Sequence, residues 1–377
     1  MSTFNILKKI YPINTSIAGK GNRKKLSIIS KEIPIKIHNY KSGTKCYDWI
    51  IPKEWEIKEA YIKSIKSNRK LLDLNDNCMH VINYSYSINK VLNLKELKKN
   101  LYTNKKLPNS IPYITSYYKK NWGFSLEYNK LKKLKNEKYK VYINSTHKKG
   151  YLNCGEAYIK GKSKSEILIS TYICHPFQAN DGNSGIAVAI QLYKFLKANK
   201  NNYYSYRFLF LPETIGAIAY LFHNEKKLKK NIKAGFVITC VGDKGKFNYK
   251  QTKNGNIFID KISKNVLKFS KFKYNIIPFF PEGSDERQYS SPGFNLMIAS
   301  IMRTPYGNYE EYHTSKDDLT FVKNKYLIES LHIYKKVIMA LEGNSIFKRY
   351  QPHCEIMLSK YGLYQDISNL SNQENDE

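Results

Sequence analysis

After residue 160 the sequence alternates between short apolar runs and amphipathic segments, and this alternation is the feature that most constrains the fold. Strands are predicted at 165–173, 204–213, 234–242 and 295–302. Helices are predicted at 184–200, 214–224, 261–271 and 324–344. The strands are nearly continuous in apolar residues, as is typical of strands covered on both faces of a sheet. Such alternation predicts parallel β-α-β units with right-handed crossovers.

The predicted fold class is therefore α/β, with a mostly parallel mixed sheet sandwiched by helices. The first fifty residues add two short helices, at 4–10 and 21–32, and a strand at 33–39, as the spacing of their apolar residues indicates. We place this α/β domain at residues 1–50 and 150–345.

Residues 51–149 have a different pattern, with alternating apolar residues and many β-formers. Strands are predicted at 50–64 and 80–93, and the segment 138–161 has the pattern of a β-hairpin. We therefore predict a mostly β inserted domain over 51–149.

The net charge of +32 would suit a nucleic-acid-binding protein. Arginine, however, accounts for only six of the 63 basic residues, and lysine for the other 57. Recognition of phosphates and bases favours arginine because its guanidinium binds in a bidentate manner. Lysine occurs here with abundant isoleucine, asparagine and tyrosine, as in proteins encoded by AT-rich genomes. We therefore expect a solvated basic surface and no nucleic-acid partner.

The sequence contains no run of about 18 apolar residues, so no membrane span is predicted. The N-terminus lacks the apolar core of a secretory signal, which favours a cytoplasmic location. The six cysteines are widely spaced and form no C-x-x-C pair. We expect buried, reduced thiols.

Ligand-type side chains follow three of the predicted strands, at the sheet edge where α/β proteins bind ligands. The first strand is followed by ICHPFQANDGNSG, which contains His175 and Asp181. Imidazole nitrogen and carboxylate oxygen suit zinc, and the loop between them would let both reach one ion. Asp181 could instead be a cap of the following helix. Glu213, at the end of the second strand, is either a carboxylate favoured by a helix dipole or a general base.

The last strand is followed by MRTPYGNYEEYHTSKDDL, which places Arg303 at the strand end and His313 in a loop. The segment PEGSDERQYSSPGFN, before that strand, groups Asp285, Glu286 and Arg287 and suggests a polar wall. A single histidine is more often structural than ligating. His313, however, is predicted at the same sheet edge as the other two clusters.

The order of these motifs resembles the zinc-dependent aminopeptidase superfamily, which also includes glutaminyl cyclase. The motifs are H-P-x-x-x-x-D-x-N-S-G, then P-E-T-x-G, then S-D-E-R, then Y-H-T-S-x-D. The chain looks closest to a bacterial aminopeptidase-like branch whose members carry an inserted β-rich domain. A winged-helix segment commonly follows in that branch, and 354–370 resembles its beginning. Residues 346–377 are therefore predicted to be a remnant of this module, with a disordered tail from Asp366.

The resemblance implies a role for five residues. His175 and His313 match zinc-ligand histidines, and Asp181 matches the aspartate that bridges two zincs in the classical enzymes. Glu213 matches the general base, and Asp285 matches an aspartate that lines the pocket.

Two departures from the pattern matter. A second glutamate that binds zinc is replaced by Thr214, and an expected aspartate is replaced by Thr239. Asp243 lies close to the second position but is not expected to replace it. The three remaining ligands resemble a catalytic site with three protein ligands, so one zinc ion is predicted rather than two.

The implied function is zinc-dependent hydrolysis of an amide or peptide bond in a small substrate, with a water on zinc activated by Glu213. From position alone, Arg287 or Arg303 would bind a substrate carboxylate. Tyr312 would line the pocket or stabilise the oxyanion. Two alternatives stay open. One is a zinc enzyme acting on a non-peptide amide of surface polysaccharide. The other is a non-catalytic binding protein, which the two missing ligands favour. The oligomeric state is not predicted.

Overall fold

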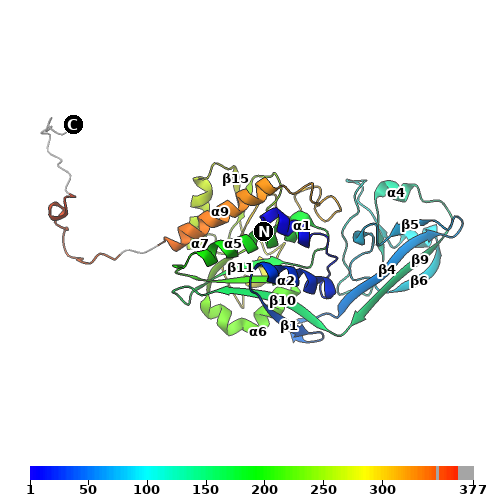
Figure 1. Ribbon diagram of the computed structural model, residues 1–377, viewed down its shortest axis with the longest axis horizontal. Helices are drawn as coiled ribbons and strands as arrows, with labels where there is room; N and C mark the ends of the chain where they lie inside the picture. The colour runs from blue at the N-terminus through cyan, green and yellow to red at the C-terminus, as the bar shows by residue number, and fades with distance from the viewer. Residues whose placement is uncertain (345–347, 364–377) are drawn as a thin grey trace. The chain divides into compact units, whose positions relative to one another are not determined.

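The computed structural model describes residues 1–344 and 348–363, which fall into two compact units, Met1–Glu342 and Gly343–Glu377. The first unit contains the helices and strands considered below (Figure 1). The described residues of the second unit contain a short 3₁₀ turn, Leu358–Tyr361. The winged-helix remnant stays a prediction, and the tail predicted to be disordered lies outside the described residues.

Within residues 1–344, eight strands form one mixed sheet in the order β1-β10-β12-β11-β13-β16-β14-β15. Their bounds are β1 Lys36–Lys41, β10 Tyr151–Ile159, β11 Glu166–Tyr172, β12 Ser205–Leu211, β13 Ile232–Val237, β14 Phe247–Lys250, β15 Tyr274–Ile277 and β16 Ile298–Met302. The central strands β12, β11, β13 and β16 are parallel, and β10 and β14 pair antiparallel with the two outer members of this group. The predicted α/β fold class is confirmed.

Helices cover both faces of this sheet (Figure 1). One face carries α1 Thr3–Ile10, α2 Lys20–Glu32, α5 Ser184–Ala198, α7 Phe258–Lys268 and α9 Asn324–Glu342. The other carries α6 Ile215–Asn231 and α8 Glu286–Tyr289. In β11, Ile167 and Ile169 pack into the first layer and Leu168 into the second, because alternate side chains of a strand point to opposite faces. Burial on both faces explains the continuous apolar runs of the central strands.

A second sheet, with an apolar core of its own, lies between residues 51 and 149. Its order is β5-β4-β9-β6, and its strands are β4 Glu54–Ser64, β5 Lys70–Asp73, β6 Ile88–Asn93 and β9 Lys138–Lys148. The short elements nearby are η1 Cys78–His80, α3 Leu94–Lys98, β7 Leu101–Tyr102, β8 Phe124–Ser125 and α4 Tyr128–Lys132. The proposed domain boundaries stay a prediction, because both sheets fall in one compact unit.

The predicted hairpin over 138–161 is wrong. β9 pairs with β4 and β6, whereas β10 pairs with β1 and β12, so the two strands belong to different sheets. Val141 and Ile143 of β9 pack into the core of the second sheet, while Leu152 and Cys154 of β10 pack into the core of the first. Alternation identified both strands correctly but did not identify their partners.

No helix in the described part of the chain is long and apolar enough to cross a membrane. The six cysteines all lie in described residues, and each is a free thiol. Cys354 is exposed, which differs from the buried thiol that was predicted.

Candidate functional site

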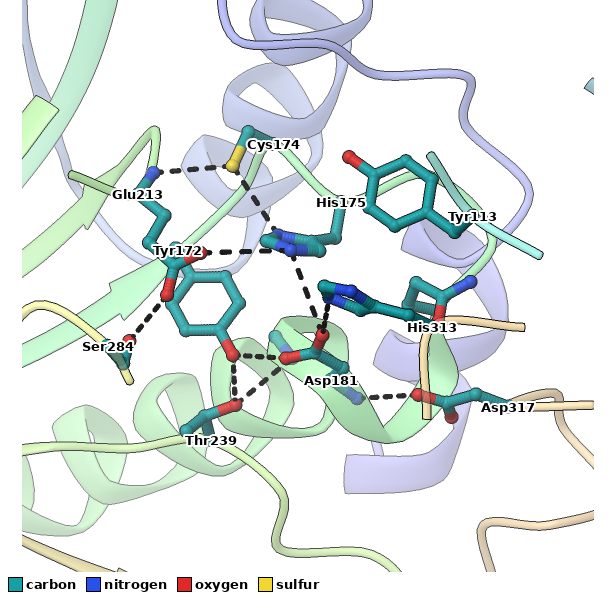
Figure 2. Close-up of polar contacts among 12 residues, drawn as sticks. Tyr113, Tyr172, Cys174, His175, Asp181, Glu213, Thr239, Ser284, His313 and Asp317 are labelled. Atoms are coloured by element: carbon teal, nitrogen blue, oxygen red, sulfur yellow. Dashed lines mark hydrogen bonds and ion pairs between the residues drawn. The ribbon is translucent and has the colours of Figure 1, made fainter. Parts of the chain in front are cut away.

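Loops at the carboxyl ends of the parallel strands supply the candidate site (Figure 2). The loop after β11 contains His175 and Asp181, and Glu213 follows β12. Thr239 follows β13, and the loop after β16 leads to His313. Residues that are distant in the sequence therefore meet at one edge of the sheet, as expected for an open α/β sheet.

His175, Asp181 and His313 form a compact cluster of potential metal ligands. One ligand atom from each residue lies within 4.8 Å of the other two. Asp181 Oδ2 is 2.9 Å from His313 Nε2 and 3.7 Å from His175 Nε2. A carboxylate oxygen and two imidazole nitrogens at such separations are a donor set that suits zinc.

The orientation of the ligand atoms also fits a cation. Asp181 Oδ2 and His313 Nε2 are both buried, yet neither has an aligned hydrogen-bond partner in the described structure. Buried polar atoms are normally hydrogen-bonded. The two atoms lie 2.9 Å apart, close enough for both to contact one cation.

Several contacts fix the position of Asp181. The Tyr172 hydroxyl donates to Asp181 Oδ1 and lies 2.6 Å from Thr239 Oγ1 (Figure 2). The Asp317 carboxylate accepts from the backbone N–H of Asn180 at 2.6 Å and of Asp181 at 3.0 Å. Asp317 lies four residues after His313 and thus connects the two ligand loops. It was not singled out from the sequence, although it belongs to the H-T-S-x-D motif.

Asp181 and His175 are in the protonation states that a metal site requires. Burial by itself would raise the pKa of Asp181, but His175, His313 and the Tyr172 hydroxyl outweigh it and lower that pKa to about 2. Burial lowers the pKa of His175 to about 4, so this imidazole is neutral at pH 7. An ionised carboxylate and a neutral imidazole are the forms that bind metal ions.

Glu213 also faces Nε2 of His175. Its Oε2 is 3.7 Å from His175 Nε2, and its Oε1 accepts a hydrogen bond of 2.7 Å from the Ser284 hydroxyl. Burial, followed by the nearby charges of Asp285 and Asp181, raises the pKa of Glu213 well above its usual range. Such an environment is typical of a carboxylate that exchanges protons near neutral pH.

A strained turn presents Glu213 to the site. Thr214 has φ 64° and ψ −77°, and the Ile215 N–H donates to the Glu213 carbonyl at 2.8 Å. These values define a γ-turn of the rare, strained kind. Strained backbone in proteins is concentrated at functional sites. Thr214 stands where a second glutamate ligand was expected, and its Oγ1 accepts a hydrogen bond from Arg287 Nη2.

Asp285 and Arg287 line the Glu213 side of the site. Asp285 Oδ1 accepts from the Thr214 N–H at 2.6 Å, while its buried Oδ2 has no hydrogen-bond partner within the described residues. Burial raises the pKa of Asp285 to about 7. Arg287 Nη2 donates to Thr214 Oγ1 at 3.1 Å, and its buried Nε has no partner in this part of the chain. Each side chain therefore has one buried polar atom that is unpaired among the described residues.

Arg303 occupies a structural environment rather than the site wall. Its guanidinium pairs with Glu329, donates to the Gly245 carbonyl at 2.9 Å and lies 4.5 Å from the centroid of the Phe247 ring. With its donors used inside the fold, it is not positioned as the substrate anchor expected from the sequence.

Asp243 does not replace the missing aspartate ligand. Its Oδ2 accepts from Asn180 Nδ2 at 2.9 Å, and its Oδ1 accepts from Thr304 Oγ1 at 2.6 Å. The carboxylate thus ties neighbouring loops together. Thr239, the residue at the substituted position, contacts Tyr172, as described above.

Aromatic side chains surround the two histidines. The Tyr312 ring stacks on the His313 ring with centroids 4.0 Å apart, so Tyr312 lies next to the ligand cluster. Tyr113, which the sequence did not suggest, comes from the segment between residues 51 and 149. Its ring centroid is 5.4 Å from that of His175 and 5.2 Å from that of His313. The Tyr113 N–H donates to the His313 carbonyl at 2.7 Å, so this segment helps to hold a ligand loop.

Comparisons with known proteins show what the chain is similar to. A Clostridium acetobutylicum protein, provisionally described as a polysaccharide biosynthesis protein with an aminopeptidase-like domain, is 47% identical over 374 residues, covering 99% of this chain and 85% of the relative. A crystal structure from the same species, provisionally described as a peptidase, has a TM-score of 0.90 at 47% identity, over 95% of this chain and 84% of that one.

More distant structures share the fold. BSAP, a zinc aminopeptidase from Bacillus subtilis, has a TM-score of 0.64 at 12% identity, over 90% of this chain and 94% of its own. A glutaminyl cyclase from an Acidobacteriales bacterium has a TM-score of 0.54 at 12% identity, over 91% and 94%. The fold is therefore the one that the resemblance implied. A profile described as a domain of unknown function (DUF4910) matches residues 4–344. Since this match spans almost the whole described chain, the protein belongs to the DUF4910 family.

Proposed function

We propose that the protein is a zinc-dependent hydrolase of amide bonds, with zinc held by His175, Asp181 and His313. The observation that carries the proposal is the convergence of three ligand atoms within 4.8 Å, next to a glutamate whose pKa is raised. The fold, shared with zinc aminopeptidases, and the peptidase description of the Clostridium acetobutylicum structure support it.

When bound, the zinc ion would supply Lewis-acid activation of water and of the scissile carbonyl. Glu213 would accept the proton of the attacking water and later donate it to the leaving nitrogen. Because its pKa is raised, its carboxylate is a stronger base than that of an exposed glutamate. Ser284 holds Oε1 in place, which leaves Oε2 directed towards His175.

Two side chains next to Glu213 would orient the substrate. The Asp285 carboxylate suits an amine or hydroxyl group, and the Arg287 guanidinium suits a carboxylate or carbonyl oxygen. Tyr312, stacked on His313, would line the same space.

The second candidate substrate is a non-peptide amide, such as an acylated amino sugar of a surface polysaccharide. The description of the Clostridium acetobutylicum relative as a polysaccharide biosynthesis protein favours it. Both candidate substrates would undergo the same amide hydrolysis. They differ only in whether the amide belongs to a peptide or to an amino sugar.

Metal analysis combined with a substrate panel tests the proposal. We expect about one zinc per chain, retained in Glu213→Gln and lost in His175→Ala. His332→Ala, which changes an exposed histidine of α9, is the matched control and should keep its metal. Aminoacyl anilides and N-acetylated amino sugars would distinguish the two substrate classes. A protein that binds no zinc after resupply would contradict the proposal and leave a binding role for the fold.

A further inference from the structure

Two adjoining hollows lie near Arg287, and their remaining lining residues have no role in the proposed hydrolysis. One has a volume of about 260 Å³ and is lined by residues that include Tyr47, Trp49 and Phe294. The other has a volume of about 650 Å³ and is lined by residues that include Trp49, Phe279 and Arg287. The smaller volume is slightly below the usual range for ligand sites, and the larger volume is within it.

The two hollows share part of their lining and form one groove that extends to Arg287, a neighbour of the candidate site. Trp49, Gln288 and Ser291 line both of them. Arg287 lines the larger hollow, and its Nη2 donates to Thr214 Oγ1, one residue after Glu213. Arg287 therefore connects the groove with the loop that carries Glu213.

The groove presents aromatic rings to solvent. Trp49 is 38% exposed and Tyr47 is 43% exposed. Both come from a short hairpin formed by β2 Lys45–Cys46 and β3 Trp49–Ile50. Large exposed aromatic residues at a concave surface indicate a binding site.

Side-chain hydrogen bonds on both sides of the hairpin hold its aromatic rings in position. Tyr47 has a φ of 53°, an unusual value for a bulky residue. Its hydroxyl donates to Glu225 Oε2 at 2.8 Å. On the other side, the Tyr118 hydroxyl donates to the Ile50 carbonyl at 3.3 Å, and its ring lies 5.5 Å from that of Trp49. Preorganised rings lose little entropy on binding.

The polar residues of the groove suit a saccharide. Asp48, Gln288 and Ser291 offer carboxylate, amide and hydroxyl groups beside the rings. A pyranose has an apolar C–H face, which packs on an aromatic ring, and a rim of hydroxyls, which need such partners. A peptide bound by strand addition would require a longer free edge than the two-residue strands β2 and β3 provide. Single-stranded nucleic acid would require a basic track, whereas Lys253 and Arg287 occur here with Asp48.

We propose that this groove binds an oligosaccharide containing N-acylated amino sugars, with its chain along Trp49 and one unit reaching the Glu213 site. The proposal rests on the proposed hydrolase function and specifies its substrate class.

Binding measured without turnover tests the groove separately from the chemistry. Full-length Glu213→Gln protein would be titrated with N-acetylchitotetraose by calorimetry and by saturation-transfer NMR, with tetraalanine as the peptide comparison. We expect the saccharide to bind and tetraalanine not to bind. Trp49→Ala should weaken saccharide binding by about tenfold or more, since one aromatic contact is lost. Phe269→Ala, which removes a ring that is 76% exposed and lines neither hollow, should leave it unchanged.

Thermal unfolding would confirm that each variant is folded, and Trp49→Tyr, which keeps a ring, should retain most of the binding. The proposal is overturned if N-acetylchitotetraose fails to bind at millimolar concentration, or if its deacetylated form or cellotetraose binds equally well. It is also overturned if tetraalanine binds equally well or if folded Trp49→Ala binds normally. Saccharide binding with no hydrolysis of any amide by the wild type would instead count against the proposed hydrolase function.

Discussion

Asp181 and Glu213 are two carboxylates that both face Nε2 of His175, and their environments shift their pKa values in opposite directions. Each has an oxygen 3.7 Å from His175 Nε2, and each comes from a loop after a parallel strand. The pKa of Asp181 is lowered to about 2, whereas that of Glu213 is raised well above its usual range. Carboxylates whose pKa values are driven apart in this way can take different chemical roles.

The difference arises from the partners of each carboxylate. Asp181 is surrounded by two histidines and the Tyr172 hydroxyl, all of which favour its ionised form. Glu213 is buried beside the acidic side chain of Asp285, and its hydrogen bond from Ser284 only partly compensates. The position of a carboxylate after a strand is therefore not sufficient to define its role. The neighbouring side chains decide whether it suits metal binding, as for Asp181, or proton transfer, as for Glu213.

The largest expected effect follows from changing the ligand carboxylate. Asp181→Asn should abolish zinc binding and hydrolysis together, because the amide removes the negative charge shared by both histidines. Zinc content and hydrolysis rate would be measured on the same preparation. A variant that loses activity but keeps its full zinc content would contradict the assignment of Asp181 as a ligand.

Removing the charge of Glu213 should instead separate zinc binding from hydrolysis. Glu213→Gln should retain zinc and lower kcat by about 10²–10⁴-fold, since a general base contributes on this scale. Single-turnover kinetics and zinc analysis would check it. Loss of the metal in this variant would show that Glu213 is a ligand and would remove the contrast with Asp181.

A smaller effect is expected from the residue that positions Asp181. Asp317→Asn should weaken zinc affinity by about 10–100-fold, because one oxygen that accepts a backbone N–H becomes an NH₂ group. Competition with a zinc chelator would measure the affinity. Asp318→Asn is the matched control, since Asp318 bonds to Thr320 and Phe321 instead. Equal effects of the two changes would argue against a positioning role.

The smallest effect concerns stability on the Glu213 side. The pKa of Asp285 is raised from 3.8 to about 7, so between these pH values the folded state binds more protons at this residue than the unfolded state. The contribution of Asp285 to stability should therefore decrease as pH rises from about 4 to about 7. In metal-free protein, Asp285→Asn should melt a few degrees higher than the wild type at pH 8, with a smaller difference at pH 4. A difference that does not vary with pH would contradict the raised pKa.

The sequence by itself determined the fold class and the order of the principal candidate residues. Continuous apolar runs and amphipathic segments are local patterns, so they indicated the central strands and the helices between them. His175, Asp181, Glu213 and His313 were recognised because each follows a predicted strand, and parallel strands direct their carboxyl ends to one edge.

Tertiary structure decided everything that depends on which segments are neighbours. Alternation in β9 and β10 could not show that the two strands enter different sheets. Nothing local indicated that Tyr113 would reach the histidines or that the donors of Arg303 would be used inside the fold. The opposite pKa shifts of Asp181 and Glu213 have the same origin, because burial and charge are set by side chains brought together from distant parts of the chain.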